Sequence, residues 1–129
     1  MRYAWSVVFA VLLLAGCGDE LPTEPLGAYF TVEVEGERFK MFVTDTDTLR
    51  LARENLQGRN QHFPIGTVQF GHAGYNQPWS WSLVPGTIRM TEAAIEVCDG
   101  RPSYVNAHID EYVRVGYCPW GAKIVAEGR

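Results

Sequence analysis

The stretch Phe30–Val43 reads FTVEVEGERFKMFV, and it decides the kind of fold that the chain can adopt. Apolar and polar residues alternate on both sides of Gly36, which is the period of two that a half-buried β-strand requires. With Gly36 and Glu37 as a two-residue loop of type II′, one face of the resulting hairpin is entirely apolar. The other face pairs opposite charges, for example Glu33 with Lys40. We therefore predict an antiparallel hairpin with its apolar face on a core.

A helix is predicted directly after this hairpin. Asp45 and Asp47 are suitable N-caps, and Gly58 supplies a C-terminal stop. Between them, apolar residues recur at the intervals of three and four that place them on one side of a helix. We predict this helix over Thr46–Gln57, with Leu49, Ala52 and Leu56 on its apolar side.

Shorter strands follow the helix. Alternating apolar residues predict strands over Val68–His72 and Trp79–Leu83, with the loop Gly74–Pro78 between them. The second of these strands places its tryptophans in the core. A turn then leads into a short returning strand over Thr87–Met90. The last apolar run, Ala122–Val125, can close the sheet.

The second half of the chain supplies one more helix. Pro102 suits a first helical position, and the helical pattern continues to about Val113. Its core stripe consists of Val105, Ile109 and Tyr112. The segment Glu92–Val97 fits both a helix and a strand, and we favour the strand. Together these elements predict an α+β fold with a largely antiparallel sheet of about five or six strands and two helices.

Residues 1–16 have the pattern of an export signal. Arg2 precedes the unbroken apolar run Val7–Leu14, and small residues lead up to Cys17. This run is shorter than the roughly 20 residues that a membrane-spanning helix needs. The stretch Leu14–Cys17 resembles the lipobox of bacterial lipoproteins. That resemblance implies cleavage before Cys17, a diacylglycerol on its sulfur and a further acyl chain such as palmitate.

The expected organisation has three parts: a signal at 1–16, the lipidated Cys17 with a flexible tether over 17–27, and a single domain over 28–129. The mature protein is therefore expected outside the cytoplasm, anchored to a membrane through the lipid. Gly18 stands where an aspartate would resemble an inner-membrane retention signal, which favours the outer membrane.

Charge and motif content exclude several classes of protein. Lys and Arg number 11 against 15 Asp and Glu, giving a net charge of −4, and neither sign forms a run. Nucleic-acid binding therefore has no electrostatic basis. The sequence contains no nucleophile elbow, phosphate-binding glycine loop, HExxH helix or calcium loop. We predict neither a cofactor nor a metal.

Cys98 and Cys118 remain once lipidation removes Cys17 from the count. In an oxidising compartment such a pair predicts a disulfide. The alternative is a metal site that combines both cysteines with His72 or His108, although no two of these residues have the close spacing of a zinc knuckle.

Three stretches carry a family resemblance: YNQPWSW at Tyr75–Trp81, AIEVCDGRP at Ala94–Pro102 and YCPW at Tyr117–Trp120. In this order they resemble a family of small secreted domains, which includes the amino-terminal domain of a calmodulin-binding protein and bacterial proteins named after it. The resemblance covers Phe39–Glu127 and implies no established activity.

The resemblance does not imply that this chain binds calmodulin. Nothing places calmodulin in a bacterial envelope, and the chain has no basic amphipathic target helix. Where relatives read Trp-His-Leu-Asp-Pro, this chain reads WSLVP at Trp81–Pro85. Any chemistry of that His and Asp is therefore absent here.

Tyr75, Asn76 and Trp120 are the candidate contact residues. The first two lie in a loop bounded by glycine and proline, and Asn76 also suits a plain turn. Trp120 follows a cysteine and a proline, which restrain its orientation. Rigid aromatic side chains lose little entropy on binding, so we expect a protein, peptide or glycan partner.

A small hydrolase is the alternative function, with Glu96 and Asp99 as acid and base. His72 or His108 would complete such a site. The simpler interpretation is that Asp99 caps the following helix and Glu96 pairs with an arginine. A protease inhibitor that presents the Tyr75 loop is a third interpretation. Because no spacing rule links the acid and base residues, we favour a non-enzymatic binding or interaction module.

Overall fold

Seven β-strands and three α-helices form the part of the chain that the structure describes, residues 26–129 of a computed structural model. The predicted signal, Cys17 and most of the tether lie outside the described residues. All strand pairs are antiparallel, so the α+β class is confirmed, with the strands divided among three sheets. No helix within residues 26–129 is long and apolar enough to cross a membrane. In chain order the elements are β1 (Ala28–Val34), β2 (Glu37–Val43), α1 (Thr46–Leu56), β3 (Phe63–Ile65), β4 (Val68–Phe70), β5 (Trp81–Leu83), β6 (Arg89–Thr91), α2 (Pro102–Ala107), α3 (Ile109–Val115) and β7 (Lys123–Glu127).

The first hairpin forms with a different turn from the predicted one. Its loop residues are Glu35 and Gly36, and both have positive φ, at 48° and 84°. Two positive φ values are the type I′ pattern, whose twist matches that of the flanking strands. The prediction of a type II′ turn over Gly36 and Glu37 is therefore wrong.

The register of β1 on β2 is shifted by two residues as a result. Glu33 lies opposite Arg38 rather than Lys40, and the Glu33 and Arg38 side chains form an ion pair at 3.1 Å. Because side chains alternate with a period of two, an even shift leaves each one on its predicted face. The apolar face is accordingly buried as expected, and it consists of Phe30, Val32, Val34, Phe39, Met41 and Val43.

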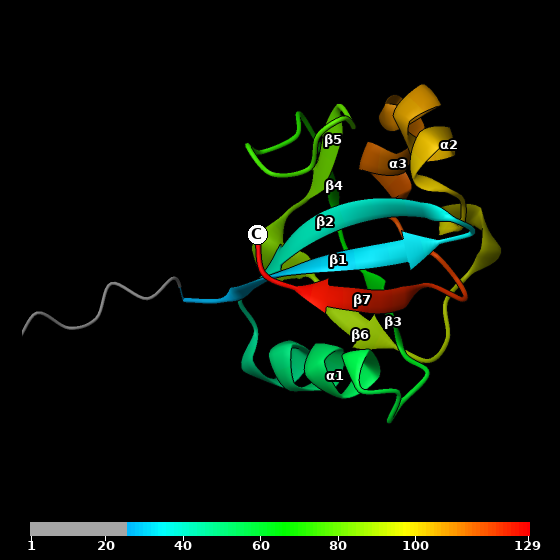
Figure 1. The fold of residues 1–129 in the computed structure, drawn as a ribbon. Coiled ribbons are helices and arrows are strands. Elements are labelled where there is room, and N and C mark those ends of the chain that lie inside the picture. The colour runs from blue at the N-terminus through cyan, green and yellow to red at the C-terminus, as the bar shows by residue number, and fades with distance from the viewer. Residues whose placement is uncertain (1–25) are drawn as a thin grey trace, which may run out of the picture.

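Strand β7 lies on the other side of β1 and completes the central sheet in the order β2-β1-β7 (Figure 1). Helix α1 begins at Thr46 as predicted, where the Asp45 carboxylate accepts a hydrogen bond from the Thr48 backbone N–H at 3.0 Å. The helix packs beside β7. At its end, Asn55 Oδ1 accepts a hydrogen bond from the Ile124 backbone N–H at 2.9 Å, which holds the helix to the strand.

Two two-stranded sheets complete the β structure. The predicted hairpin after α1 is present as β4 and β5, although β5 begins only at Trp81, which is fully buried. The predicted returning strand is present as β6, and its partner is β3. The sequence does not predict β3, because this strand is three residues long and contains Pro64, which cannot donate to a strand ladder.

The segment Glu92–Val97 is not a strand, which corrects the prediction. It runs as irregular chain into a 3₁₀ turn at Glu96–Cys98. There the Cys118 N–H donates to the Cys98 carbonyl at 2.7 Å, so the end of the segment is held against the chain around Cys118 instead of a sheet. The second predicted helix is broken into α2 and α3 at His108, where φ is −136°. Its predicted core residues Val105 and Tyr112 are nevertheless buried.

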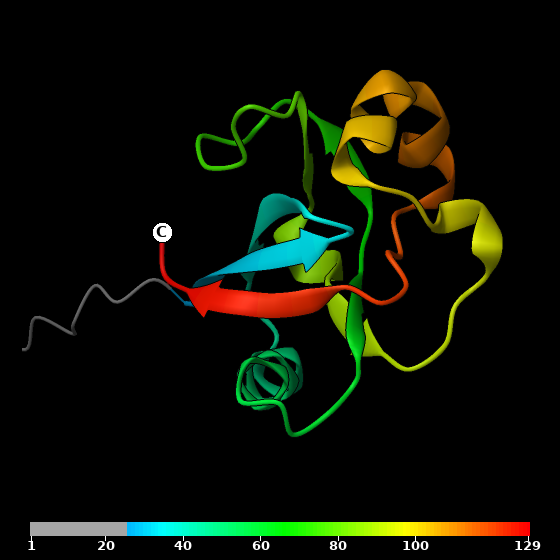
Figure 2. The same cartoon turned by 45° about the vertical axis from the view of Figure 1, so that its right-hand side comes forward.

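Strand β1 runs from one end of the domain toward the other (Figures 1 and 2). Its Ala28 end lies beside the end of the chain, where the Gly128 N–H donates to the Tyr29 carbonyl at 2.7 Å. At its other end, the turn into β2 lies against α2, and the Ser103 N–H donates to the Glu37 carboxylate at 2.8 Å. The turn and α2 therefore lie at the opposite end of β1 from Ala28.

Candidate functional site

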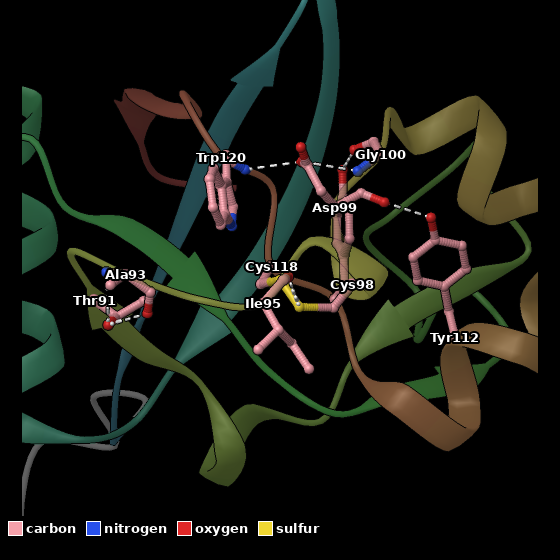
Figure 3. Close-up of a disulfide and its surroundings, with 10 residues drawn as sticks. Thr91, Ala93, Ile95, Cys98, Asp99, Gly100, Tyr112, Cys118 and Trp120 are labelled. Atoms are coloured by element: carbon pink, nitrogen blue, oxygen red, sulfur yellow. Dashed lines mark hydrogen bonds between the residues drawn. A yellow bond between two sulfur atoms is a disulfide. The ribbon is translucent and has the colours of Figure 1, made fainter.

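Cys98 and Cys118 form the predicted disulfide, with their Cα atoms 5.1 Å apart (Figure 3). Both side chains are buried. Among residues 26–129, no group of three His, Cys, Asp or Glu side chains is placed to hold a metal ion. Because both sulfur atoms are used in the disulfide, they are not available as ligands for the alternative metal site with His72 or His108.

The Asn76 side chain joins two backbone segments inside the domain. Its side chain is 1% exposed, accepts a hydrogen bond from the Lys40 N–H at 2.7 Å and donates one to the Trp81 carbonyl at 2.8 Å. Close by, the Trp79 indole N–H donates to the Arg38 carbonyl at 2.8 Å. The loop before β5 thus satisfies polar groups on the outer edge of β2, which an unpaired edge strand would leave open. Of the two interpretations of Asn76, the structure agrees with the turn, because the Asn76 carbonyl accepts a hydrogen bond from the Trp79 N–H at 3.0 Å and the side chain is buried rather than open to a partner.

Tyr75 and Trp120 differ in their exposure. The Tyr75 ring packs edge-on against Tyr29 at 5.2 Å, and burial raises the pKa of its hydroxyl. Tyr75 is therefore half-buried instead of projecting from the loop. Trp120, in contrast, is 43% exposed, and its ring lies 6.4 Å from that of Phe63. Of the two aromatic candidates, Trp120 is the better placed for contact.

Asp99 organises the corner after the disulfide (Figure 3). Its Oδ1 atom accepts hydrogen bonds from the backbone N–H groups of Gly100 at 2.8 Å and Trp120 at 2.9 Å, and its carbonyl accepts one from the Tyr112 hydroxyl at 2.6 Å. The N-cap of α2 is Arg101, without a side-chain hydrogen bond. Asp99 therefore does not cap that helix, which corrects the prediction.

Buried aromatic rings join the three family motifs. The rings of Trp81 and Tyr117 meet edge to face at 5.3 Å, and the Trp81 indole N–H donates to the Pro102 carbonyl at 3.3 Å. The Tyr117 hydroxyl donates to the Gly100 carbonyl at 2.6 Å. Burial raises the pKa of Tyr117, and it raises that of Tyr112 to about 12, so both remain neutral donors near pH 7. Each motif thus contacts the other two.

Gly100 and Tyr112 of this junction also line an open depression of about 630 Å³, which we call the acidic depression. Of the described residues that line it, Arg101 alone is basic, and its Nε lies 3.5 Å from the Glu35 carboxylate. Tyr104, which is half exposed, contributes an aromatic ring. The carboxylates that line the depression belong to Glu35, Glu96, Asp99 and Glu111.

The acidic depression brings Glu96 and Asp99 to one surface without either candidate histidine. His72 lies in the loop before β5, where its Nδ1 atom accepts a hydrogen bond from the Gly74 N–H at 2.8 Å. The His108 ring stacks on Tyr104 at 4.1 Å but does not line the depression. Glu96 forms no ion pair within residues 26–129, which corrects the expected pairing with an arginine.

A second depression, of about 510 Å³, is lined by residues 93–95 and by Cys98, and we call it the apolar groove. The Cys98–Cys118 disulfide forms part of its wall. Arg114 is the single charged residue among the described residues that line it. Its apolar side chains come from Ile65, Ala93, Ala94, Ile95, Val113 and Val115.

A family model, that of the BP-74 N-terminal domain, matches residues 27–129 and so includes all three motifs and both depressions. The chain belongs to the BP-74 N-terminal domain family. The domain resemblance drawn from the sequence is thereby confirmed. No curated protein and no solved structure matches the chain. In this member of the family, buried residues of the three motifs pack around Asp99 and Gly100, and both of these residues line the acidic depression.

Proposed function

We propose that the chain is a lipid-anchored protein of the bacterial envelope whose BP-74 N-terminal domain acts as a binding module. The signal-like segment at 1–16 and the lipobox-like stretch at Leu14–Cys17 support the anchor. Acyl chains on Cys17 would hold the protein at a membrane surface, because each buried methylene contributes about 0.8 kcal/mol. The residues after Cys17 would then connect the lipid to the start of β1.

The observation that carries the binding function is the position of the acidic depression relative to this tether. Glu35, at the turn after β1, lines the depression, whereas the tether enters at Ala28. The seven residues of β1 separate the two points by about 20 Å at roughly 3.3 Å per residue. Attachment at the Ala28 end would leave the acidic depression at the opposite end of β1, where a partner in the envelope can reach it.

The contacts of Asp99 favour binding over hydrolysis. A general acid–base pair must reach, with its carboxylate oxygens, the substrate protons that it transfers. Oδ1 of Asp99 is instead held by two backbone N–H groups, at 2.8 and 2.9 Å, and joins Gly100 to Trp120. These hydrogen bonds favour a structural role for the Asp99 carboxylate, which fixes the backbone at one wall of the acidic depression.

The test is a photo-cross-link formed in living cells that produce the full-length protein. A benzophenone-bearing amino acid at Tyr104, which lines the acidic depression, should give a discrete cross-linked product with an envelope component. The same amino acid at Phe70 is the matched control, because Phe70 is 64% exposed and lines neither depression. Absence of a product at Tyr104, or equal products at both positions, would contradict the binding function.

A further inference from the structure

Two apolar side chains are exposed to solvent on the segment that contributes residues to both the acidic depression and the apolar groove. Ile95 is 67% exposed and Val97 is 63% exposed. Ile95 borders the apolar groove and Val97 borders the acidic depression. Val115, which also lines the apolar groove, is 43% exposed. Ile95 and Val97 lie two positions apart in one segment and each borders a depression, so a ligand that enters both depressions would cover both side chains.

The charges beside this apolar surface restrict what can cover it. Glu96 and Glu111 line the acidic depression and form no ion pair within residues 26–129. Glu35 shares its charge with Arg101 at 3.5 Å, with both side chains more than half exposed. Among the described residues, the acidic depression has four carboxylates against the one basic residue Arg101, and the apolar groove adds only Arg114. The surface next to Val97 therefore carries net negative charge, and the complementary ligand is cationic as well as apolar.

Two other occupants fit this pattern poorly. A lipid surface with anionic headgroups would be repelled by the carboxylates of Glu96 and Glu111. A twofold contact with a second copy of the chain would place this surface of one copy against the same surface of the other. Glu96 of one copy would then approach the acidic depression of the other. Like charges at a contact of this kind cost binding energy. A protein segment that carries Lys or Arg beside an apolar residue meets neither obstacle.

We propose that this surface binds an extended segment of a partner protein in which apolar residues are next to Lys or Arg. An apolar side chain occupies the apolar groove between Ile95 and Val115, and the cationic side chain enters the acidic depression. There it meets the free carboxylates and the exposed ring of Tyr104, which can hold a cation over its face. The proposal rests on the binding function above and specifies the chemistry of the partner.

The experiment uses the full-length chain in non-ionic detergent and a fluorescently labelled nonapeptide of alternating Leu and Lys as the probe. The matched probe alternates Leu and Glu. Fluorescence anisotropy should give an affinity at least about tenfold higher for the Lys probe, and that affinity should fall as salt is raised, because exposed charges are screened. Equal affinity for both probes would overturn the proposal.

Two pairs of variants locate the binding site. Glu96→Gln with Glu111→Gln should weaken binding of the Lys probe about tenfold, whereas Asp47→Asn with Glu54→Gln on α1 removes the same charge and should leave it unchanged. Ile95→Ser should likewise weaken binding, and Phe70→Ser, at a site of similar exposure, should not. Melting curves of all four proteins check that each is folded.

The outcomes separate this inference from the function on which it rests. A partner cross-linked at Tyr104, together with no preference for the Lys probe, would leave the binding module standing and overturn the cationic segment. If the unacylated chain binds anionic vesicles and Ile95→Ser abolishes that binding, a lipid surface is the occupant. If the chain forms a dimer that Ile95→Ser disrupts, a second copy is the occupant. Either result would also overturn the proposal. Loss of binding in both control variants would show that the effect is not local to this surface.

Discussion

The carboxylate of Asp99 and the backbone of Trp120, twenty-one positions apart, are joined by a hydrogen bond of 2.9 Å. The same Oδ1 atom also accepts a hydrogen bond from the Gly100 N–H at 2.8 Å. Beside them, the disulfide from Cys98 makes a covalent link between the same two motifs. The surface around Trp120 is thus fixed by one covalent bond and one charged hydrogen-bond acceptor.

Asp99→Ala should lower the free energy of unfolding by about 1–3 kcal/mol, because it leaves two backbone N–H groups without their acceptor. Asp99→Asn is the matched control. It keeps an oxygen acceptor of the same shape and should cost less. Urea denaturation under non-reducing conditions measures both values. An equal loss in the two variants would show that the negative charge, and not the acceptor, is what matters.

Replacing Cys98 and Cys118 together by Ser should cost about 3 kcal/mol, since their bond closes a loop with a sequence separation of 20. Denaturation of the double variant beside the unchanged protein measures this cost. The unchanged protein should also show no reactive thiol at either position when it is denatured without reductant. Thiol labelling at Cys98 or Cys118 in that state would contradict the disulfide.

The sequence predicts those features of the fold that depend on local pattern. The buried face of the first hairpin is correct even though its register is not, because the turn residues Glu35 and Gly36 shift the pairing by an even number. Helix α1 is predicted closely, since its cap at Asp45 and its stop at Gly58 are local signals. Strand β3 has no such signal, because it depends on pairing with the distant β6.

The candidate site is less predictable than the fold, because it is assembled by tertiary contacts. Glu35 reaches the acidic depression from a hairpin turn, and Tyr104 and Glu111 reach it from two different helices. None of the three lies in a family motif. Conversely, Asn76 lies in a motif but is buried. The sequence does not predict this burial, because the glycine and proline that bound the loop do not indicate which strand edge the loop will cover.

Asn76→Ala should destabilise the domain by about 2–4 kcal/mol, because the Trp81 carbonyl would lose a buried hydrogen bond and the Lys40 N–H a part-buried one. Asn76→Asp keeps the acceptor for the Lys40 N–H but places a buried carboxylate against the Trp81 carbonyl, so near neutral pH its cost should be at least as large as that of Asn76→Ala. Thermal or urea denaturation gives the order. An Asn76→Ala protein as stable as the unchanged one would show that the hydrogen bonds of Asn76 do not stabilise the domain.

Stability should decrease at alkaline pH through the buried tyrosines. Burial raises the pKa of Tyr112 from about 10 to about 12 in the folded protein. A raised folded-state pKa favours the neutral form, so the stabilisation is complete below pH 10 and is lost as the pH rises toward 12. Tyr112→Phe should therefore lose less stability over this interval than the unchanged protein. Urea denaturation at several pH values measures the difference, and identical slopes would contradict the assignment.

Cys17→Ser in the full-length chain should abolish acylation and release the protein from the membrane fraction. Serine cannot form the thioether to diacylglycerol, and without acyl chains no buried methylenes remain to hold the protein at about 0.8 kcal/mol each. Gly18→Ser, which keeps the cysteine, is the matched control and should still incorporate labelled palmitate. Fractionation of cells followed by immunoblotting measures both. Should the Cys17→Ser chain remain in the membrane fraction, uncleaved and without lipid, residues 1–16 would be acting as an ordinary anchor, and the proposed lipoprotein would be wrong.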